Sequence, residues 1–151
     1  MIWYSHLLIK DYSIINPNDD VNCGQSTNDV IPTAGKMTSL RLLKNLKKEL
    51  LRLHKALCAK AKEFDHVIKM GRTQMQDAVP IRLGQEFNAY SVAVMRDIHR
   101  MDRAMEEMCT LNMGGTAVGT GINADEAYLR RIVPNLVEVS DMEFVQAYDL
   151  I

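Results

Sequence analysis

Two short polar segments of this 151-residue chain carry the side chains best suited to hold a charged ligand. The first contains Ser26, Thr27 and Asn28, which offer two hydroxyls and an amide, and the second contains Thr73 and Gln74. Each segment precedes a long stretch of helical periodicity. Free backbone N–H groups and the positive end of the helix dipole make such places favourable for carboxylates. Either segment alone could be only a helix cap, but together they indicate a carboxylate-binding site.

Two long amphipathic helices and a shorter third are predicted to position these segments. Apolar residues recur at steps of three or four from Leu40 to Ile68, and again from Phe87 to Met108. Pro32, which suits an early helical position, lies ahead of the first stripe. Helices of this length extend over roughly 40 to 50 Å, so neither can bury its stripe within a small domain. We therefore predict an all-α extended bundle with seams covered by other chain segments or subunits, and a self-contained helical hairpin as the alternative.

The first helix also separates the two polar segments. Ser26–Asn28 lies ahead of it and Thr73–Gln74 lies beyond it, so the two would be roughly tens of ångströms apart in one chain. They can contribute to one site only if neighbouring chains pack antiparallel. This geometry predicts an oligomer.

The remaining segments interrupt helical periodicity. Residues 69–85 contain two glycines and a proline. The glycine-rich segment 112–125 lacks the lysine of a Walker loop and the preceding strand of a dinucleotide-binding motif, so we interpret it as a tight connector in which Thr116 can approach a ligand. A shorter helix is predicted from about residue 125, with Pro134 as a kink or an interruption. No segment alternates apolar and polar residues in the manner of a strand.

Composition excludes several classes of partner. A formal net charge of -1 gives no reason to expect nucleic acid or anionic lipid. No apolar run is long enough to span a membrane, and residues 1–15 lack the basic start and small-residue cleavage site of a signal peptide. Three cysteines match no metal or redox spacing and are predicted to be reduced thiols of a cytoplasmic protein. Four scattered histidines lack the spacing of a helical metal site, so no metal ion is predicted.

Three sequence blocks carry a family resemblance: NPNDDVNCGQSTNDVIPTA at residues 16–34, IKMGRTQMQDAVPIRLGQEF at 68–87 and NMGGTAVGTGIN at 112–123. In this order and spacing they resemble the aspartase/fumarase superfamily. The resemblance implies a homotetramer with a central helical bundle, in which each active site gathers residues from three subunits. It also divides the chain into residues 1–32, a remnant of the N-terminal domain with the substrate-binding segment, and residues 33–151, the first part of the central helical-bundle domain.

The resemblance assigns roles to the polar residues named above. Ser26, Thr27 and Asn28 match the block that binds the carboxylate and amino groups of a small dicarboxylate, such as L-aspartate or fumarate. Thr73 matches a carboxylate-binding threonine, and Gln74 takes the next position, which is often histidine. An amide does not titrate near neutral pH and cannot shuttle a proton as histidine does. Gln74 therefore favours the ammonia-lyase branch, a carbon–nitrogen lyase without an organic cofactor, over fumarate hydratases.

A further segment matches a second ligand site of the superfamily. Asn16, Pro17, Asn18 and Asp19 correspond to the residues that form a secondary dicarboxylate site in fumarases. Asn16 stands in place of the histidine that is usual there, which weakens the match at that position.

The superfamily's signature loop does not occur in this sequence. That loop reads approximately Gly-Ser-Ser-x-Met-Pro-x-Lys-x-Asn-Pro and carries the serine that acts as the base. We therefore predict a fragment, about one third of a family member, that is inactive alone. A fumarate hydratase fragment and a non-catalytic helical oligomerisation module are the alternatives.

Overall fold

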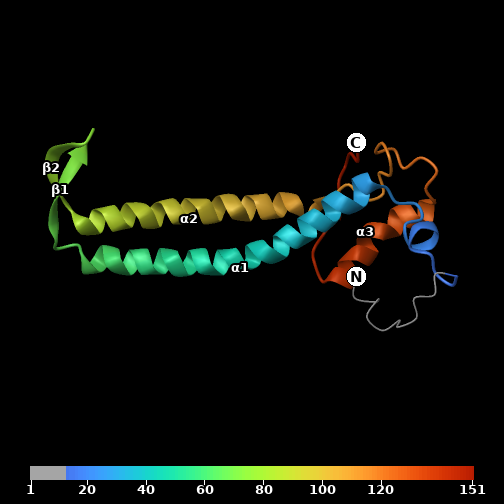
Figure 1. Cartoon of the computed structure of the whole chain (residues 1–151), viewed down its shortest axis with the longest axis horizontal. Coiled ribbons are helices and arrows are strands. Elements are labelled where there is room, and N and C mark those ends of the chain that lie inside the picture. Colours follow the sequence, from blue (N-terminus) through green and yellow to red (C-terminus); the bar gives the residue numbers. More distant parts are fainter. Residues whose placement is uncertain (1–12) are drawn as a thin grey trace. The chain divides into compact units, whose positions relative to one another are not determined.

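The computed structural model describes residues 13–151. Residues 1–12 lie outside the described residues. They are the start of the predicted N-terminal remnant, and they make up most of the segment that is unlike a signal peptide. The chain forms two compact units, each described by itself: the residues up to Gly35 together with Thr110–Ile151, and Lys36–Cys109. Helices make up most of the described chain, which confirms the predicted all-α class (Figure 1). None of the described helices is long and apolar enough to cross a membrane.

The described elements, in chain order, are the π-helical turn η2 (Pro17–Val21), α1 (Thr27–Glu63), β1 (Ile68–Thr73), β2 (Gln76–Arg82), α2 (Leu83–Met108), β3 (Thr110–Leu111), α3 (Glu126–Ser140) and β4 (Val145–Gln146). The two long helices and the shorter third helix of the prediction are therefore present. The first begins at Thr27, within the predicted cap segment and ahead of the apolar stripe that starts at Leu40. It ends at Glu63, so Ile68, the last residue of the predicted stripe, lies in β1 instead.

In the unit Lys36–Cys109, α2 runs back along α1 in the opposite direction (Figure 1). Lys47 Nζ donates to Asp102 Oδ1 over 2.5 Å towards one end of the pair. At the other end the rings of Phe64 and Phe87 lie 5.4 Å apart, centre to centre. Residues distant in sequence thus pair in reverse order, as an antiparallel helical pair requires.

The apolar stripe of α1 is only partly covered. Leu40 is 4% exposed, and Ile98 of α2 is 2% exposed. Further along α1, Leu46 and Leu53 are 49% and 47% exposed. A half-open apolar face is what the sequence predicts for a seam that another segment or subunit covers. What covers it here stays a prediction.

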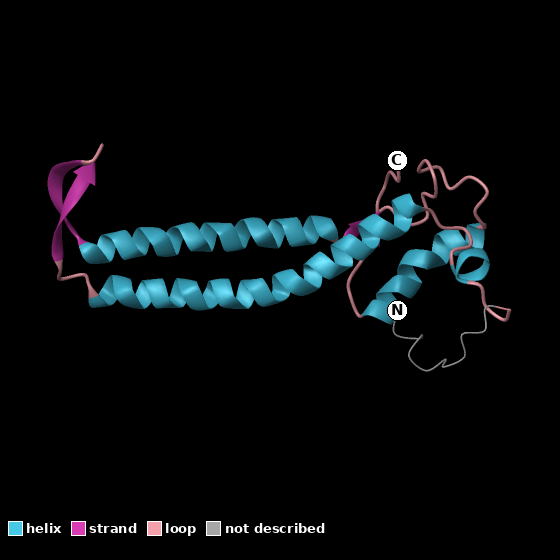
Figure 2. Ribbon diagram, viewed as in Figure 1, coloured by secondary structure: helices cyan, strands magenta, loops and turns pink. Residues whose placement is uncertain are grey.

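The prediction that the chain contains no strand is wrong, because β1 and β2 form an antiparallel hairpin between the two long helices (Figure 2). Thr73 pairs with Gln76, which leaves Gln74 and Met75 as a two-residue turn. Most residues of both strands are exposed. Since neither face of the hairpin packs on a core, the sequence carries no apolar alternation by which the strands could be found.

Gly84 fixes the place where the hairpin returns to the helices. Its amide donates to Phe64 O over 3.0 Å, and a β-carbon at this position would lie 2.3 Å from Ala61 O. Any larger residue would push the start of α2 away from the end of α1. Gly84 therefore serves a close approach of two helix ends and does not break α2.

The other unit contains α3, the glycine-rich segment and the start of α1. α3 continues through Pro134, so the predicted interruption does not occur. β3 and β4 form a short parallel pair in which Thr110 is opposite Val145. The buried apolar side chains described in this unit are Leu111, Met113, Val133, Met142 and Phe144. All three cysteines of the chain are free thiols, as predicted.

Candidate functional site

Ser26 caps the N-terminus of α1. Its Oγ accepts a hydrogen bond from the amide of Asn28 at 3.2 Å, and the carboxylate of Asp29 accepts one from the amide of Ser26 at 3.2 Å. These reciprocal bonds satisfy amides that a helix start leaves without an intrahelical partner. The cap interpretation of this segment is therefore confirmed, and it places Ser26, Thr27 and Asn28 at the helix start.

Asp29 connects this helix start to the glycine-rich segment. Its side chain is fully buried (0% exposed), and its Oδ2 accepts a second hydrogen bond, from the amide of Thr116 at 3.2 Å. A buried carboxylate needs such partners, because moving an unpaired charge from water into the protein interior is strongly unfavourable. One oxygen of Asp29 thus holds the backbones of Ser26 and Thr116 together.

Asn112 adds a second connection between the same two segments. Pro32 has no amide hydrogen, so it cannot give the carbonyl of Asn28 the usual helical hydrogen bond. The side chain of Asn112 donates instead, with its Nδ2 3.0 Å from Asn28 O. The proline near the start of α1 therefore frees an acceptor that the glycine-rich loop uses.

The side chain of Asn28 is directed to the same loop. Its Nδ2 donates to the carbonyl of Ala117 over 2.8 Å. Since only the NH₂ group of an amide can donate, this bond fixes the orientation of the side chain and leaves Oδ1 as an acceptor. An oxygen of this kind can accept a hydrogen bond from an ammonium group.

The loop itself has an unusual backbone. The described loop residues with φ in the left-handed region are Gly114, Thr116, Gly119, Gly121 and Asn123. The unusual angles that the glycines predict are therefore present. At 59°, the φ of Thr116 is rare for a β-branched residue. Strain of this kind persists only where the surroundings hold it, and it concentrates at functional sites.

An open pocket of about 450 Å³ lies between the helix start and the loop. Its walls include Ser26 and Thr27 on the helix side, and Thr116, Ala117 and Asn123 on the loop side. The two predicted hydroxyl residues therefore face a cavity within their own unit. Its size suits a small ligand, and it is shallow enough to stay open to solvent.

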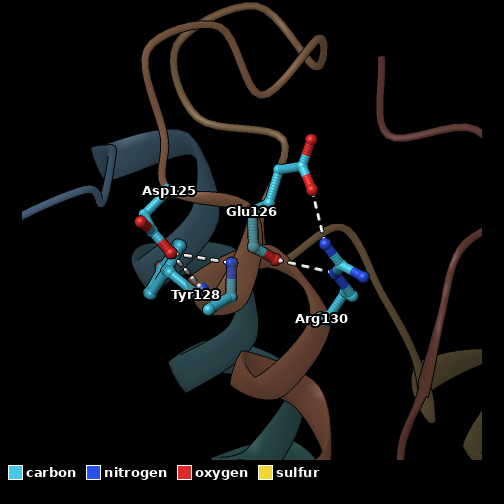
Figure 3. Close-up of polar contacts among 5 residues, drawn as sticks. Asp125, Glu126, Tyr128 and Arg130 are labelled. Carbon is cyan, nitrogen blue, oxygen red and sulfur yellow. Dashed lines mark hydrogen bonds and ion pairs between the residues drawn. The ribbon is translucent and has the colours of Figure 1, made fainter.

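Tyr128 belongs to the same polar cluster. Burial raises the pKa of its phenol, and the negative charge of Asp29 raises that pKa further. Figure 3 shows how the backbone is held here: Asp125 Oδ1 caps α3 by accepting the amides of Ala127 and Tyr128 at 2.7 and 3.2 Å. Among the described residues, Tyr128 Oη, Asp29 Oδ1 and Thr116 Oγ1 are buried without a hydrogen-bond partner.

Thr73 and Gln74 lie in the other unit, at the exposed tip of the hairpin. Gln74 and Met75 have φ values of 49° and 64°. Two positive φ values match the twist of a two-residue hairpin, and Asn or Gly usually supplies them. Gln74 is thus held in a strained turn. The segment 26–28 and the glycine-rich loop therefore belong to one unit, and Thr73 and Gln74 belong to the other.

A larger open groove, about 810 Å³, lies beside this hairpin. Lys69 and Arg72 line it, but both cations already have carboxylate partners within the unit. Lys69 Nζ donates to Glu86 Oε2 over 2.6 Å, and this bond, with one from the Tyr90 hydroxyl, holds the pKa of Glu86 below its usual range. Paired cations attract a further anion weakly, so the smaller pocket is the better candidate.

The secondary dicarboxylate site is predicted at Asn16, Pro17, Asn18 and Asp19. Asn16 directly precedes η2, and the other three residues form its first positions. Asn16 Oδ1 accepts the amide of Asp19 at 3.3 Å, and the amide of Asn16 donates to Asp20 Oδ2 over 2.7 Å. These groups stabilise the turn itself. A second ligand site here stays a prediction.

Known proteins share the sequence of this chain along most of its length. The lyase family matches residues 6–150. The chain belongs to this lyase family. The predicted resemblance is thereby confirmed at the level of the family.

Individual relatives of this chain include two kinds of enzyme. The chain is 50% identical over 141 residues to the aspartate ammonia-lyase of Bacillus subtilis (strain 168), a match that covers 93% of the chain and 30% of that relative. It is 42% identical over 134 residues to the class II fumarate hydratase of Rhizobium meliloti (strain 1021), covering 88% and 29%. The chain thus spans about 30% of the length of the curated relatives it matches.

A solved structure agrees with the fold of this chain. The fumarate lyase:delta crystallin from Brucella melitensis superposes with a TM-score of 0.83 and 46% sequence identity, over 93% of this chain and 31% of that one. The similarity in structure therefore covers the same share of the chain, 93%, as the similarity in sequence.

Two residues of the site, Asp29 and Asn112, are not among those that the sequence motifs predict. The spacing Ser-x-x-Asp at residues 26–29 is typical of a capping box and could have indicated Asp29. Nothing local could have indicated the second hydrogen-bond partner of Asp29, because Thr116 lies 87 residues away.

Proposed function

We propose that this lyase chain forms part of the active site of an aspartate ammonia-lyase, which converts L-aspartate to fumarate and ammonia. The observation that carries the proposal is the pocket in which Ser26 and Thr27 face Thr116 at the start of a helix. The similarity to the aspartate ammonia-lyase of B. subtilis supports this substrate. Because the chain spans 30% of that relative, the activity and its substrate are proposed for the whole enzyme.

The reaction removes a proton and an amine from adjacent carbons. A base takes a proton from the β-carbon of L-aspartate, and the electron pair of that C–H bond delocalises into the neighbouring carboxylate as a doubly charged aci-carboxylate. The pair then forms the C=C bond of fumarate while the C–N bond breaks and its electrons leave with ammonia. Fixed donors around the carboxylate stabilise the intermediate more than they stabilise L-aspartate, and this difference accelerates the reaction.

In this proposal Ser26, Thr27 and Thr73 donate hydroxyl hydrogen bonds to the carboxylates. The Oγ of Ser26 already accepts the amide of Asn28, so its own hydrogen is available to a ligand. Asn28 and Gln74 accept hydrogen bonds from the ammonium end, Asn28 through the Oδ1 that its bond to the loop leaves open. Neither amide titrates, so both keep the same role at every physiological pH.

The base is not among these residues. The serine loop of the superfamily does not occur in the sequence, so we infer that this chain alone does not catalyse the reaction. We also infer that the whole enzyme is a cytoplasmic homotetramer. Antiparallel packing of neighbours would bring residues 73–74 of one subunit to residues 26–28 of another. The half-exposed leucines of α1 support packing of this kind.

A chimeric enzyme tests the proposal. The 141-residue segment of this chain that matches the B. subtilis aspartate ammonia-lyase replaces the corresponding segment of that enzyme. The chimera is expected to form fumarate from L-aspartate, and the double variant Ser26→Ala, Thr27→Val is expected to lose most of that activity while it still assembles. A correctly assembled but inactive chimera contradicts the proposal. This chain alone, supplied with L-aspartate, is expected to release no fumarate.

A hydratase segment is the second candidate, because the chain is also 42% identical to a class II fumarate hydratase. The same segment placed in the R. meliloti enzyme separates the two. If the chain comes from a hydratase, this second chimera forms malate from fumarate efficiently and the first is poor. If it comes from an ammonia-lyase, Gln74→His has to be introduced before the second chimera approaches its parent.

A non-catalytic oligomerisation module is the third candidate, favoured by the exposed apolar face of α1. Sizing chromatography combined with a succinate titration separates it from the other two. A stable oligomer that binds no succinate supports the module. An oligomer that binds succinate supports a segment of an active site.

A further inference from the structure

Asp29 lies buried directly behind the segment that the proposed function assigns to the substrate. Its Oδ2 is 3.2 Å from the amide nitrogen of Ser26 and 3.2 Å from the amide nitrogen of Thr116. Both of these residues line the pocket of about 450 Å³. We propose that Asp29 is a positioning residue, which holds the two walls of this pocket at a fixed separation and thereby sets its affinity for a dicarboxylate. The role rests on the proposed function of the pocket.

The burial of Asp29 strengthens its hydrogen bonds to the amides of Ser26 and Thr116. The side chain is 0% exposed, so water cannot replace a hydrogen bond that the carboxylate loses. Hydrogen bonds to an ionised acceptor are also roughly twice as strong as neutral ones. If the two walls separated, the buried carboxylate of Asp29 would lose one of its two hydrogen-bond donors. The wall of Ser26 and the wall of Thr116 are therefore coupled through one atom.

The loop needs such a fixed contact because its backbone is strained where it meets Asp29. Thr116, whose amide makes the bond, has a φ of 59°. A β-branched residue leaves this conformation when nothing holds it. The bond from Thr116 to Asp29 therefore helps to hold the loop in the form that borders the pocket.

Two further hydrogen bonds join the same walls at the surface. Asn28 Nδ2 donates to Ala117 O over 2.8 Å, and Asn112 Nδ2 donates to Asn28 O over 3.0 Å. Both are neutral and exposed, so solvent can compete for their groups. They offer a second, weaker means of testing the same coupling without a change at the buried carboxylate.

The substitution Asp29→Asn is the primary test, because it removes the charge and keeps the shape of the side chain. Isotope-labelled chain, unmutated and variant, is titrated with succinate, an unreactive dicarboxylate, and the amide resonances of Ser26 and Thr116 are followed by NMR. In the variant both resonances are expected to shift together and exchange their protons faster. Affinity for succinate is expected to fall about tenfold, as loss of charge assistance at two hydrogen bonds predicts.

Asp125→Asn is the matched control. Asp125 also accepts two backbone amides, those of Ala127 and Tyr128, but it is exposed and caps α3 (Figure 3). The control variant is expected to change those two amides and to leave the affinity for succinate unchanged. A residue with a merely structural role would move stability in both variants and affinity in neither.

The outcomes separate the two proposals. Unchanged Ser26 and Thr116 resonances in Asp29→Asn, or changed resonances with unchanged affinity, would overturn the positioning role and leave the proposed function standing. Failure of the unmutated chain to bind succinate would overturn the proposed function, and this role with it. If Asp29→Asn does not fold, Asn112→Ala replaces it. That variant is expected to weaken succinate binding in the same direction but less, and unchanged affinity would overturn the coupling.

Discussion

The backbone amide of Thr116 donates a hydrogen bond to Oδ2 of Asp29, 3.2 Å away and 87 positions earlier in the sequence. The same oxygen accepts the amide of Ser26, which caps α1. A helix cap and a loop far along the chain therefore share one buried acceptor. Because the pocket lies between these two segments, its shape depends on this shared atom as well as on the residues that line it.

Asp29→Ala is expected to lower the free energy of unfolding by about 3 kcal/mol, because two amides lose a buried, charged acceptor. Asp125→Ala removes an exposed N-cap that also accepts two amides, and about 1 kcal/mol is expected there. Urea denaturation followed by circular dichroism measures both. Equal losses in the two variants would contradict the importance of burial at Asp29.

Stability is expected to fall at alkaline pH because of Tyr128. In the unfolded chain its phenol ionises near the ordinary pKa of about 10. In the folded chain burial and the charge of Asp29 raise that pKa, so the neutral form is favoured. The stabilisation is therefore fully present below the unfolded pKa and is lost as the pH rises towards the folded pKa.

Thermal unfolding midpoints, measured as the pH rises from neutral through the ordinary pKa of tyrosine, report this loss of stability. Tyr128→Phe is expected to flatten the alkaline decrease, since it removes the titrating group. Tyr148→Phe, at a fully exposed ring, is the control and should leave the decrease as it is. An identical decrease in all three proteins would exclude Tyr128 as its source.

The long helices are predictable from sequence because each places one apolar face along the other. The apolar stripe does not reach the start of α1, whose first turns contain a buried Asp29 and Pro32 instead of leucines at helical spacing, so the cap at Ser26 and Pro32 are what indicate where this helix begins. The hairpin, in contrast, is missed. Its exposed strands bury no face, so the pattern on which strand prediction depends does not form.

The candidate site is predictable in part. Ser26 and Thr27 lie on one wall of the pocket, at the predicted helix start. Thr116 lies on the opposite wall, in the loop that the sequence marks by its glycines. Local motifs indicate residue types and caps, and these were enough for both walls. The join between the walls depends on contacts of Asp29 and Asn112 across more than half the chain, which no local motif specifies.

Gly84→Ala is expected to cost about 1 to 3 kcal/mol of stability, as overpacking does at a close contact. Its new β-carbon would lie 2.3 Å from Ala61 O, where backbone cannot move aside easily. Gly35→Ala is the matched control, because a β-carbon there meets nothing within 4 Å inside α1. The control is expected to stabilise the chain by about 0.5 to 1 kcal/mol. A loss at both positions would contradict the close approach at Gly84.

Met75→Gly is expected to stabilise the chain by about 0.5 kcal/mol, since relief of a left-handed conformation outweighs the added freedom of glycine in the unfolded state. Met75 has a φ of 64° and is 98% exposed, so the change removes strain and little packing. Met70→Gly, in the adjoining strand β1, is expected to destabilise by about 0.5 to 1 kcal/mol instead. Urea denaturation of both variants measures this opposition in sign. A loss of stability in Met75→Gly would contradict strain at this position of the turn.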